Sequence, residues 1–192
     1  MIRRLLMLTI ILYGVALVQA CAPVILAGGA TAAVAANDRR TVGAQLDDKS
    51  IEIKSRRTLN DDPKLGDDVH ININSMNGSV LLTGEASTAE LRDEVLEQIR
   101  SVDGIRRVVN EIRITEPTAF ANRTRDSWIT GNIKTKILAT KDLVSGHIKV
   151  VTEDSVVYLL GVVDRKEADL ATEAARSADG VERVVRLFEY VD

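Results

Sequence analysis

One thiol, two imidazoles and a dense group of carboxylates are the side chains of this 192-residue sequence that could do chemistry. A thiolate is a nucleophile, and cysteine and histidine are the usual ligands of zinc. Cys21 is the only cysteine, and His70 and His147 are the only histidines. Neither histidine has a second histidine or a cysteine near it in sequence, so we expect structural roles for both and no metal site.

The carboxylates are concentrated in the segment NDDPKLGDDVH, residues 60–70, which contains Asp61, Asp62, Asp67 and Asp68. Carboxylate oxygens are ligands that calcium prefers, but the EF-hand spacing is missing, and we interpret the segment as a solvated acidic loop. The GxSxG, P-loop, HExxH and GxGxxG patterns are absent as well. The sequence therefore predicts a protein without enzymatic activity, cofactor or metal.

The cysteine follows a segment with the order of a secretory signal. Arg3 and Arg4 form a charged start, residues 5–18 are almost entirely apolar, and a small residue precedes Cys21. The apolar run of about 14 residues is shorter than the roughly 20 that a membrane-spanning helix needs. We therefore expect residues 1–20 to be a cleaved signal peptide.

The four residues Val18-Gln19-Ala20-Cys21 resemble the lipobox of bacterial lipoproteins. The resemblance implies that Cys21 is acylated and becomes the N-terminus, and that Ala22 directs the protein to the outer membrane, on its periplasmic face. A lone cysteine suits an oxidising compartment, where a second thiol would invite a disulfide. The alternative is a chance cysteine in the signal. We expect the lipidated end and a spacer rich in alanine and glycine over residues 21–45.

Removal of the signal peptide leaves 23 of the 25 basic side chains, because only Arg3 and Arg4 are charged within it. The 28 acidic side chains all remain, so the mature chain is acidic. This balance argues against nucleic acid as a partner, since proteins that bind it present basic surfaces.

The sequence contains two copies of one unit. RSVDGIRRVVNEIRI at residues 100–114 aligns with RSADGVERVVRLFEY at residues 176–190. Upstream, SVLLTG at residues 79–84 aligns with VVYLLG at residues 156–161. The small differences in spacing fall between the matched segments, which places them in loops.

We expect one module at residues 46–116, a linker at 117–121 and a second module at 122–192. Each module reads helix, strand, strand, helix, strand. Asn77-Gly78 separates the two strands of the first module, and both turn positions of such a pair accept positive φ, as a tight hairpin requires. A helical stripe at four-residue spacing marks the first helix of the second module: Ile129, Ile133 and Ile137.

The second helix of each module begins with a capping-box spacing, Ser87 with Glu90 and Asp164 with Glu167. In the second module the apolar face of this helix is made of alanines, which let a helix approach a sheet closely: Ala168, Ala171, Ala175 and Ala178.

The two modules resemble the BON domain, a small envelope module with the same element order. The resemblance rests on the glycine that closes the second strand and the glycine between the second helix and the last strand: Gly84, Gly104, Gly161 and Gly180. It implies an α+β fold in which two helices pack on one face of a three-stranded sheet. Behind a lipobox, the pair resembles the dual-BON outer-membrane lipoproteins of Gram-negative bacteria. That family implies phospholipid binding and support of outer-membrane integrity.

Trp128, the only tryptophan, is the most informative single residue of the second module. At 100° per residue it points about 140° away from the centre of the isoleucine stripe. The corresponding residue of the first module is close to Ser50. Trp128 therefore either packs against the first module or the linker, or projects as an anchor at a membrane interface.

The residues around Trp128 are basic within an acidic protein. From position 123 to position 149 only Asp126 and Asp142 oppose six basic side chains: Arg123, Arg125, Lys134, Lys136, Lys141 and Lys149. Such a surface beside an aromatic side chain attracts anionic headgroups. We predict lipid binding by Trp128 together with Arg123, Arg125, Lys134, Lys136 and Lys141. The rival prediction is an adaptor that uses Trp128 and the first module to bind a protein partner in the envelope.

Overall fold

The computed structural model describes residues 38–117 and 120–191, with only the backbone of residues 120–123. The signal sequence, Cys21 and the spacer up to residue 37 lie outside the described residues. Module one contains α3 (Val42–Asn60), η2 (Gly66–Asp68), β1 (Val69–Met76), β2 (Ser79–Ala86), α4 (Ala89–Arg100) and β3 (Arg107–Ile114). Module two contains α5 (Phe120–Ala139), η3 (Ser145–His147), β4 (Ile148–Glu153), β5 (Val156–Val163), α6 (Arg165–Arg176) and β6 (Arg183–Tyr190).

Each module has one three-stranded sheet, in the order β1-β2-β3 and β4-β5-β6. The first two strands of each sheet pair antiparallel through a tight hairpin, whereas the third strand runs parallel to the second. A parallel neighbour needs a crossover, and α4 and α6 provide it. The predicted α+β fold with two αββαβ modules is confirmed.

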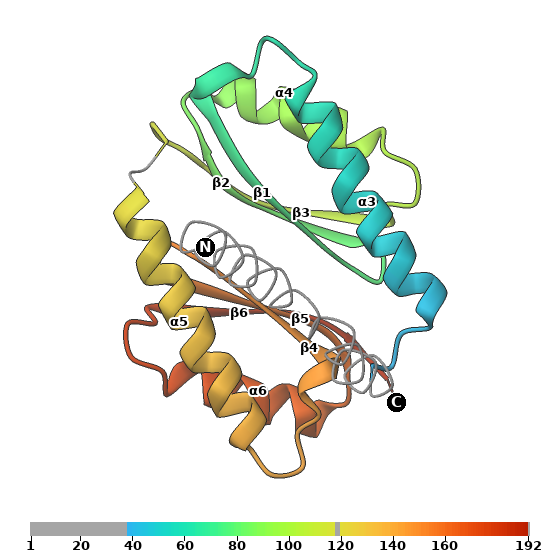
Figure 1. Ribbon diagram of the computed structural model, residues 1–192, viewed down its shortest axis with the longest axis vertical. Helices are drawn as coiled ribbons and strands as arrows, with labels where there is room; N and C mark the ends of the chain where they lie inside the picture. Colours follow the sequence, from blue (N-terminus) through green and yellow to red (C-terminus); the bar gives the residue numbers. More distant parts are fainter. Residues whose placement is uncertain (1–37, 118–119, 192) are drawn as a thin grey trace, which may run out of the picture. The chain divides into compact units, whose positions relative to one another are not determined.

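Two helices cover one face of each sheet, α3 and α4 in module one and α5 and α6 in module two (Figure 1). The core of module one joins Ile51 and Ile99 of its helices to Val80 and Leu82 of β2. In module two, Ile129 takes the place of Ile51, and the predicted alanine face of α6 is buried. The capping box of Asp164 and Glu167 is present, but α4 begins one residue later than its spacing predicts, with Thr88 accepting from the Leu91 amide.

The predicted hairpin turn at Asn77-Gly78 is confirmed, with φ of 50° and 72°. Asp154 and Ser155 take the same conformation in module two, with φ of 47° and 62°. These two residues lack the freedom of glycine, so other contacts must hold their backbone in the left-handed region.

The glycines that close the second strands allow a very close approach of the neighbouring strand. A Cβ atom on Gly84 would lie 2.0 Å from the carbonyl oxygen of His70, and one on Gly161 would lie 2.3 Å from that of His147. No side chain fits at either position, because real Cβ atoms do not approach other atoms so closely.

The helix-free faces of the two sheets pack against each other. Met76 and Leu81 of module one form a buried cluster with Tyr158 and Leu160 of module two. The Tyr158 hydroxyl donates to Glu111 of module one at 3.1 Å, and burial together with this carboxylate raises the pKa of Tyr158. The two modules therefore share a core of their own in addition to their separate cores.

Candidate functional site

The inner face of α5 fixes how the helix is turned. Ile129, Ile133 and Ile137 are buried in the core of module two, as the helical stripe predicts. In the first half of the helix, the buried Asp126 accepts hydrogen bonds from the amides of Asp154 and Ser155 at 2.8 and 3.0 Å. These bonds stabilise the positive-φ turn of the β4–β5 hairpin and hold α5 against it.

The opposite face of α5 presents uncharged side chains to solvent. Trp128 is 58 % exposed and Leu138 is 71 % exposed. At 100° per residue, Trp128, Gly131, Thr135 and Leu138 fall within roughly 80° of arc, so they form one stripe along the helix. Of the two interpretations of Trp128, the exposed fraction agrees with the projecting one. Leu138 is not among the residues predicted to bind lipid, although its position on the helical wheel could have identified it.

Basic side chains flank this stripe on both sides. The same geometry places Arg125 and Lys136 beyond one edge of the stripe and Lys134 beyond the other. Lys141 follows the helix, two residues after its end at Ala139. Arg125, Lys134 and Lys141 are exposed and Lys136 is half-buried. Within the described residues, none of these four cations forms an ion pair. Their charges are therefore available to an external anion.

Other charges of this stretch are used inside the protein. Lys149 lies away from the stripe and forms an ion pair with Glu52 of module one at 2.6 Å. Asp126 is buried under the hairpin, and Asp142 pairs with Lys166 at 3.1 Å. The side chain of Arg123 lies outside the described residues. We define the candidate lipid face, called the lipid face below, as Trp128, Gly131, Thr135 and Leu138 with the nearby basic residues Arg125, Lys134, Lys136 and Lys141.

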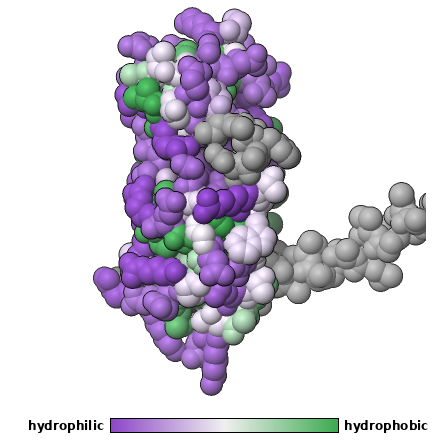
Figure 2. Space-filling view, turned by 90° about the vertical axis from the view of Figure 1, so that its left-hand side faces the viewer, coloured by the Kyte–Doolittle hydropathy of each residue, from purple (hydrophilic) through white to green (hydrophobic). Residues whose placement is uncertain are grey.

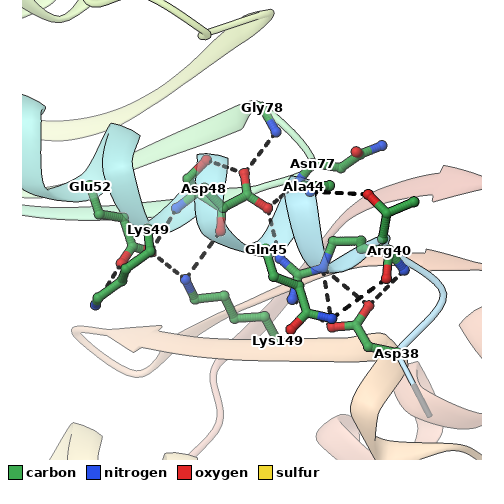
Figure 3. Close-up of polar contacts among 12 residues, drawn as sticks. Asp38, Arg40, Ala44, Gln45, Asp48, Lys49, Glu52, Asn77, Gly78 and Lys149 are labelled. Carbon is green, nitrogen blue, oxygen red and sulfur yellow. Dashed lines mark hydrogen bonds and ion pairs between the residues drawn. The ribbon is translucent and has the colours of Figure 1, made fainter. Parts of the chain in front are cut away.

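The equivalent helix of module one, α3, carries an aspartate in the same role and further charged contacts on its inner face (Figure 3). The buried Asp48 accepts hydrogen bonds from the amides of Asn77 and Gly78, at 2.7 and 2.8 Å, and from the guanidinium of Arg40 at 2.7 Å. Burial alone would raise the pKa of Asp48, but these bonds and one from the Ser75 hydroxyl outweigh burial and hold that pKa below its usual range.

Glu52 follows one turn later on the same helix and receives the Lys149 ammonium from module two (Figure 3). It also accepts from the Ser75 amide at 3.0 Å. Burial opposes the ionised form of Glu52, yet the bonds from Lys149 and Ser75 leave its pKa lowered. The inner face of α3 is thus a charged anchor between the two modules.

The two histidines lie at equivalent places, each before the first strand or at its start, and differ in burial. His147 is buried, with its Nδ1 atom 2.7 Å from Glu167, whose other oxygen accepts from Arg39 at 2.6 Å. His70 is half-buried. Across residues 38–117 and 124–191, no group of three or more histidine, cysteine, aspartate or glutamate side chains is arranged to hold a metal ion.

Figure 2 views the molecule from the side on which Figure 1 draws α5. Hydrophobic residues form small separate patches on this side, surrounded by hydrophilic ones (Figure 2). In the described part of the chain, no helix has the length and apolarity needed to cross a bilayer.

Comparison with known proteins identifies both modules. The BON domain model matches residues 47–116 and 125–192. The chain is 32 % identical over 185 residues to the Outer membrane lipoprotein DolP of Haemophilus influenzae, covering 96 % of both chains. It is 35 % identical over 154 residues to the 21 kDa hemolysin of Actinobacillus pleuropneumoniae, covering 80 % of this chain and 79 % of that protein.

A third relative is the Osmotically-inducible protein Y of Escherichia coli, 29 % identical over 146 residues. The alignment covers 74 % of this chain and 72 % of the relative. The resemblance inferred from the four glycines and the repeat is confirmed, and the chain belongs to the BON-domain family, of which it carries two domains.

Proposed function

We propose that this protein is a periplasm-facing outer-membrane lipoprotein that binds anionic phospholipid through the lipid face of α5. Acyl chains on Cys21 would hold it to the membrane, and module two would concentrate it where anionic lipid is enriched. The observation that supports this most strongly is the exposed Trp128–Leu138 stripe between unpaired basic side chains. The relation to a DolP lipoprotein over nearly the whole chain supports the location.

Binding through this face would combine two weak attractions into one selective contact. Each lysine or arginine near an anionic surface contributes about 1 kcal/mol, and tryptophan favours the boundary between water and acyl chains. Neither term alone holds a protein on a bilayer for long. Acyl chains supply the durable part, since each buried methylene contributes about 0.8 kcal/mol.

Module one is less suited to this task as a whole, because residues 46–116 contain 10 basic and 15 acidic side chains. Its second helix exposes three of these acids, Glu90, Asp93 and Glu97. We infer that the protein supports outer-membrane integrity by holding its two modules at patches of anionic lipid. No reaction is part of this role.

Charge reversal on the lipid face tests the proposal. The compact unit of residues 38–192 carrying Lys134→Glu and Lys136→Glu should bind anionic vesicles at least about 30-fold more weakly than the unchanged unit, since two attractive charges of about 1 kcal/mol each are lost. The control is Lys64→Glu with Arg100→Glu, which makes the same change in net charge on exposed positions of module one. Equal losses in the two variants would mean that only net charge matters and would refute the assigned face.

A further inference from the structure

Module one has an exposed apolar stripe of its own, on the outer face of α3. Val42, Leu46 and Ile53 are 69 %, 66 % and 55 % exposed. At 100° per residue they fall within roughly 40° of arc, so the three aliphatic side chains follow one line along the helix. We call Val42, Leu46 and Ile53 the α3 stripe. Clustered exposure of large aliphatic side chains marks interaction surfaces, whereas single exposed residues are ordinary.

The inner face of α3 prevents the helix from rolling to bury this stripe (Figure 3). Asp48 and Glu52 point into the protein and accept six hydrogen bonds between them from the first hairpin, Arg40 and Lys149. Rotation of α3 would break these bonds and expose the core residue Ile51. The stripe is therefore held outward by contacts within module one and by the Glu52–Lys149 contact that joins the modules.

The charges beside the α3 stripe are positive. Lys49 lies on the same line between Leu46 and Ile53, and the line continues to the exposed Arg56 and Arg57. Lys49 and Arg57 pair with acids of their own helix or its end, but both side chains stay well exposed, at 65 % and 82 %. No acidic side chain lies on the line itself. The α3 stripe and its basic neighbours thus have the composition of a surface that binds a partner with both apolar and anionic groups.

The position of the α3 stripe in the sequence indicates which partner this surface contacts. Val42 follows the proposed acylation site, Cys21, by 21 residues. A chain of this length spans at most about 75 Å when fully extended, at no more than 3.6 Å per residue. The membrane that holds the acyl chains is therefore always within reach of the first turn of α3.

We propose that the α3 stripe is a second membrane-binding surface, which lays Val42, Leu46 and Ile53 on an anionic bilayer beside the point where the lipid anchor joins module one. This second surface is separate from the lipid face on α5. The one assumption that the two proposals share is the acylation of Cys21. Amphipathic helices of this kind lie in the interface plane, with aliphatic side chains among the acyl chains and basic ones at the headgroups.

The test places a reporter on each helix of the full-length lipoprotein reconstituted in vesicles. Ile53→Cys introduces the only free thiol once Cys21 is acylated, and an NBD label there reports on α3 while Trp128 reports on α5. We expect a rise and blue shift of NBD emission in vesicles containing phosphatidylglycerol relative to vesicles of phosphatidylcholine alone. The matched control is Glu97→Cys on the exposed face of α4, whose label should not respond.

The two reporters separate the two ideas. A response of Trp128 without a response at position 53 would overturn the second surface and leave the α5 proposal standing, and the reverse result would overturn only the α5 proposal. A label at position 53 that is blue-shifted equally in both vesicle types would mean that protein covers the stripe, which contradicts the proposal. A shift that follows protein density in the vesicles instead of lipid composition would assign the stripe to a second copy of the chain.

Discussion

At the scale of single residues, an aspartate at the start of the first helix does the same work in both modules. Asp48 and Asp126 each accept from the two amides of a hairpin turn whose residues have positive φ. Residues other than glycine adopt a positive φ only at a cost in free energy. The carboxylate offsets this cost by accepting hydrogen bonds from the two turn amides, which have no partner in the strands. The aspartate therefore links the helix to the sheet and selects the turn.

The lowered pKa of Asp48 predicts how stability depends on pH. Because the unfolded chain takes up the Asp48 proton at higher pH than the folded one, this contribution to stability is complete above about pH 4 and is lost as the pH falls through the folded pKa. Asp48→Asn should cost about 1–3 kcal/mol at pH 7. It should also flatten the loss of unfolding free energy below pH 4, as measured by urea unfolding monitored at Trp128. Parallel pH curves for the two proteins would contradict this role.

The two strand-closing glycines give a prediction about packing. Gly161→Ala places a Cβ atom 2.3 Å from the carbonyl oxygen of His147, so β4 and β5 must separate or shift. We expect a loss of about 2–4 kcal/mol in the free energy of unfolding, within the range of severe overpacking and strain.

The control for this loss is Gly131→Ala on α5, where an added Cβ meets nothing within 4 Å. It should stabilise the protein by about 0.5–1 kcal/mol, because alanine is the better helix former. Thermal unfolding of both variants measures the difference. If Gly161→Ala were as harmless as Gly131→Ala, the close approach of the two strands would not constrain the residue type at position 161.

At the scale of elements, much of the fold could be predicted, because local signals and burial agree there. The isoleucines of α5, the Asn77-Gly78 turn and the strand-closing glycines each follow from one residue pattern with one physical cause. The start of α4 was predicted one residue early, since Ser87 and Thr88 are both good caps and only packing decides between them.

The candidate site was less predictable, because exposure depends on partners distant in sequence. Trp128 could be placed on the outer face from helical angles, but the fate of the nearby charges could not. Lys149 belongs to the basic stretch of the sequence, yet it is 97 residues from the Glu52 that binds it. The aspartates that clamp the hairpins could have been found, because both copies of the repeat carry an acid three residues before the first core isoleucine.

The outer face of α5 should tolerate changes that its inner face does not. Leu138 is mostly exposed, so Leu138→Ser should leave the free energy of unfolding within about 0.5 kcal/mol of the original value. Binding of residues 38–192 to anionic vesicles should weaken by about 5- to 30-fold. A leucine that becomes partly buried in the membrane interface on binding contributes about 1–2 kcal/mol.

Ile114→Ser is the matched control, since Ile114 is also an exposed aliphatic residue but lies at the end of β3. Co-sedimentation with vesicles should show no loss for this variant. An equal loss for both would mean that general surface hydrophobicity, and not the α5 face, drives binding.

At the scale of the whole folded unit, the packing of the two sheets makes the position of the lipid face a property of both modules. The proposed lipid anchor would join module one through residues 38–41, while the proposed lipid face belongs to module two. Arg39 crosses to Glu167 of module two at 2.6 Å, and its neighbour Arg40 binds Asp48 of module one at 2.7 Å. Together with the shared core, these contacts keep α5 in a fixed relation to residues 38–41.

The ion pair of Glu52 and Lys149 should contribute more to this arrangement than pairs at the rim of the interface. Both side chains are partly removed from water, and Gln at position 52 can still accept from the Ser75 amide, so Glu52→Gln with Lys149→Met gives a clean double-mutant cycle. We expect a coupling energy of about 1–2 kcal/mol in urea unfolding, because removal of one partner leaves a buried charge without compensation. Another inter-module pair, Arg106 with Glu189 at 2.9 Å, is more than half exposed on the arginine side. It should couple by less than about 0.5 kcal/mol in the cycle Arg106→Met with Glu189→Gln. Equal coupling in the two cycles would mean that the buried pair adds nothing beyond surface attraction.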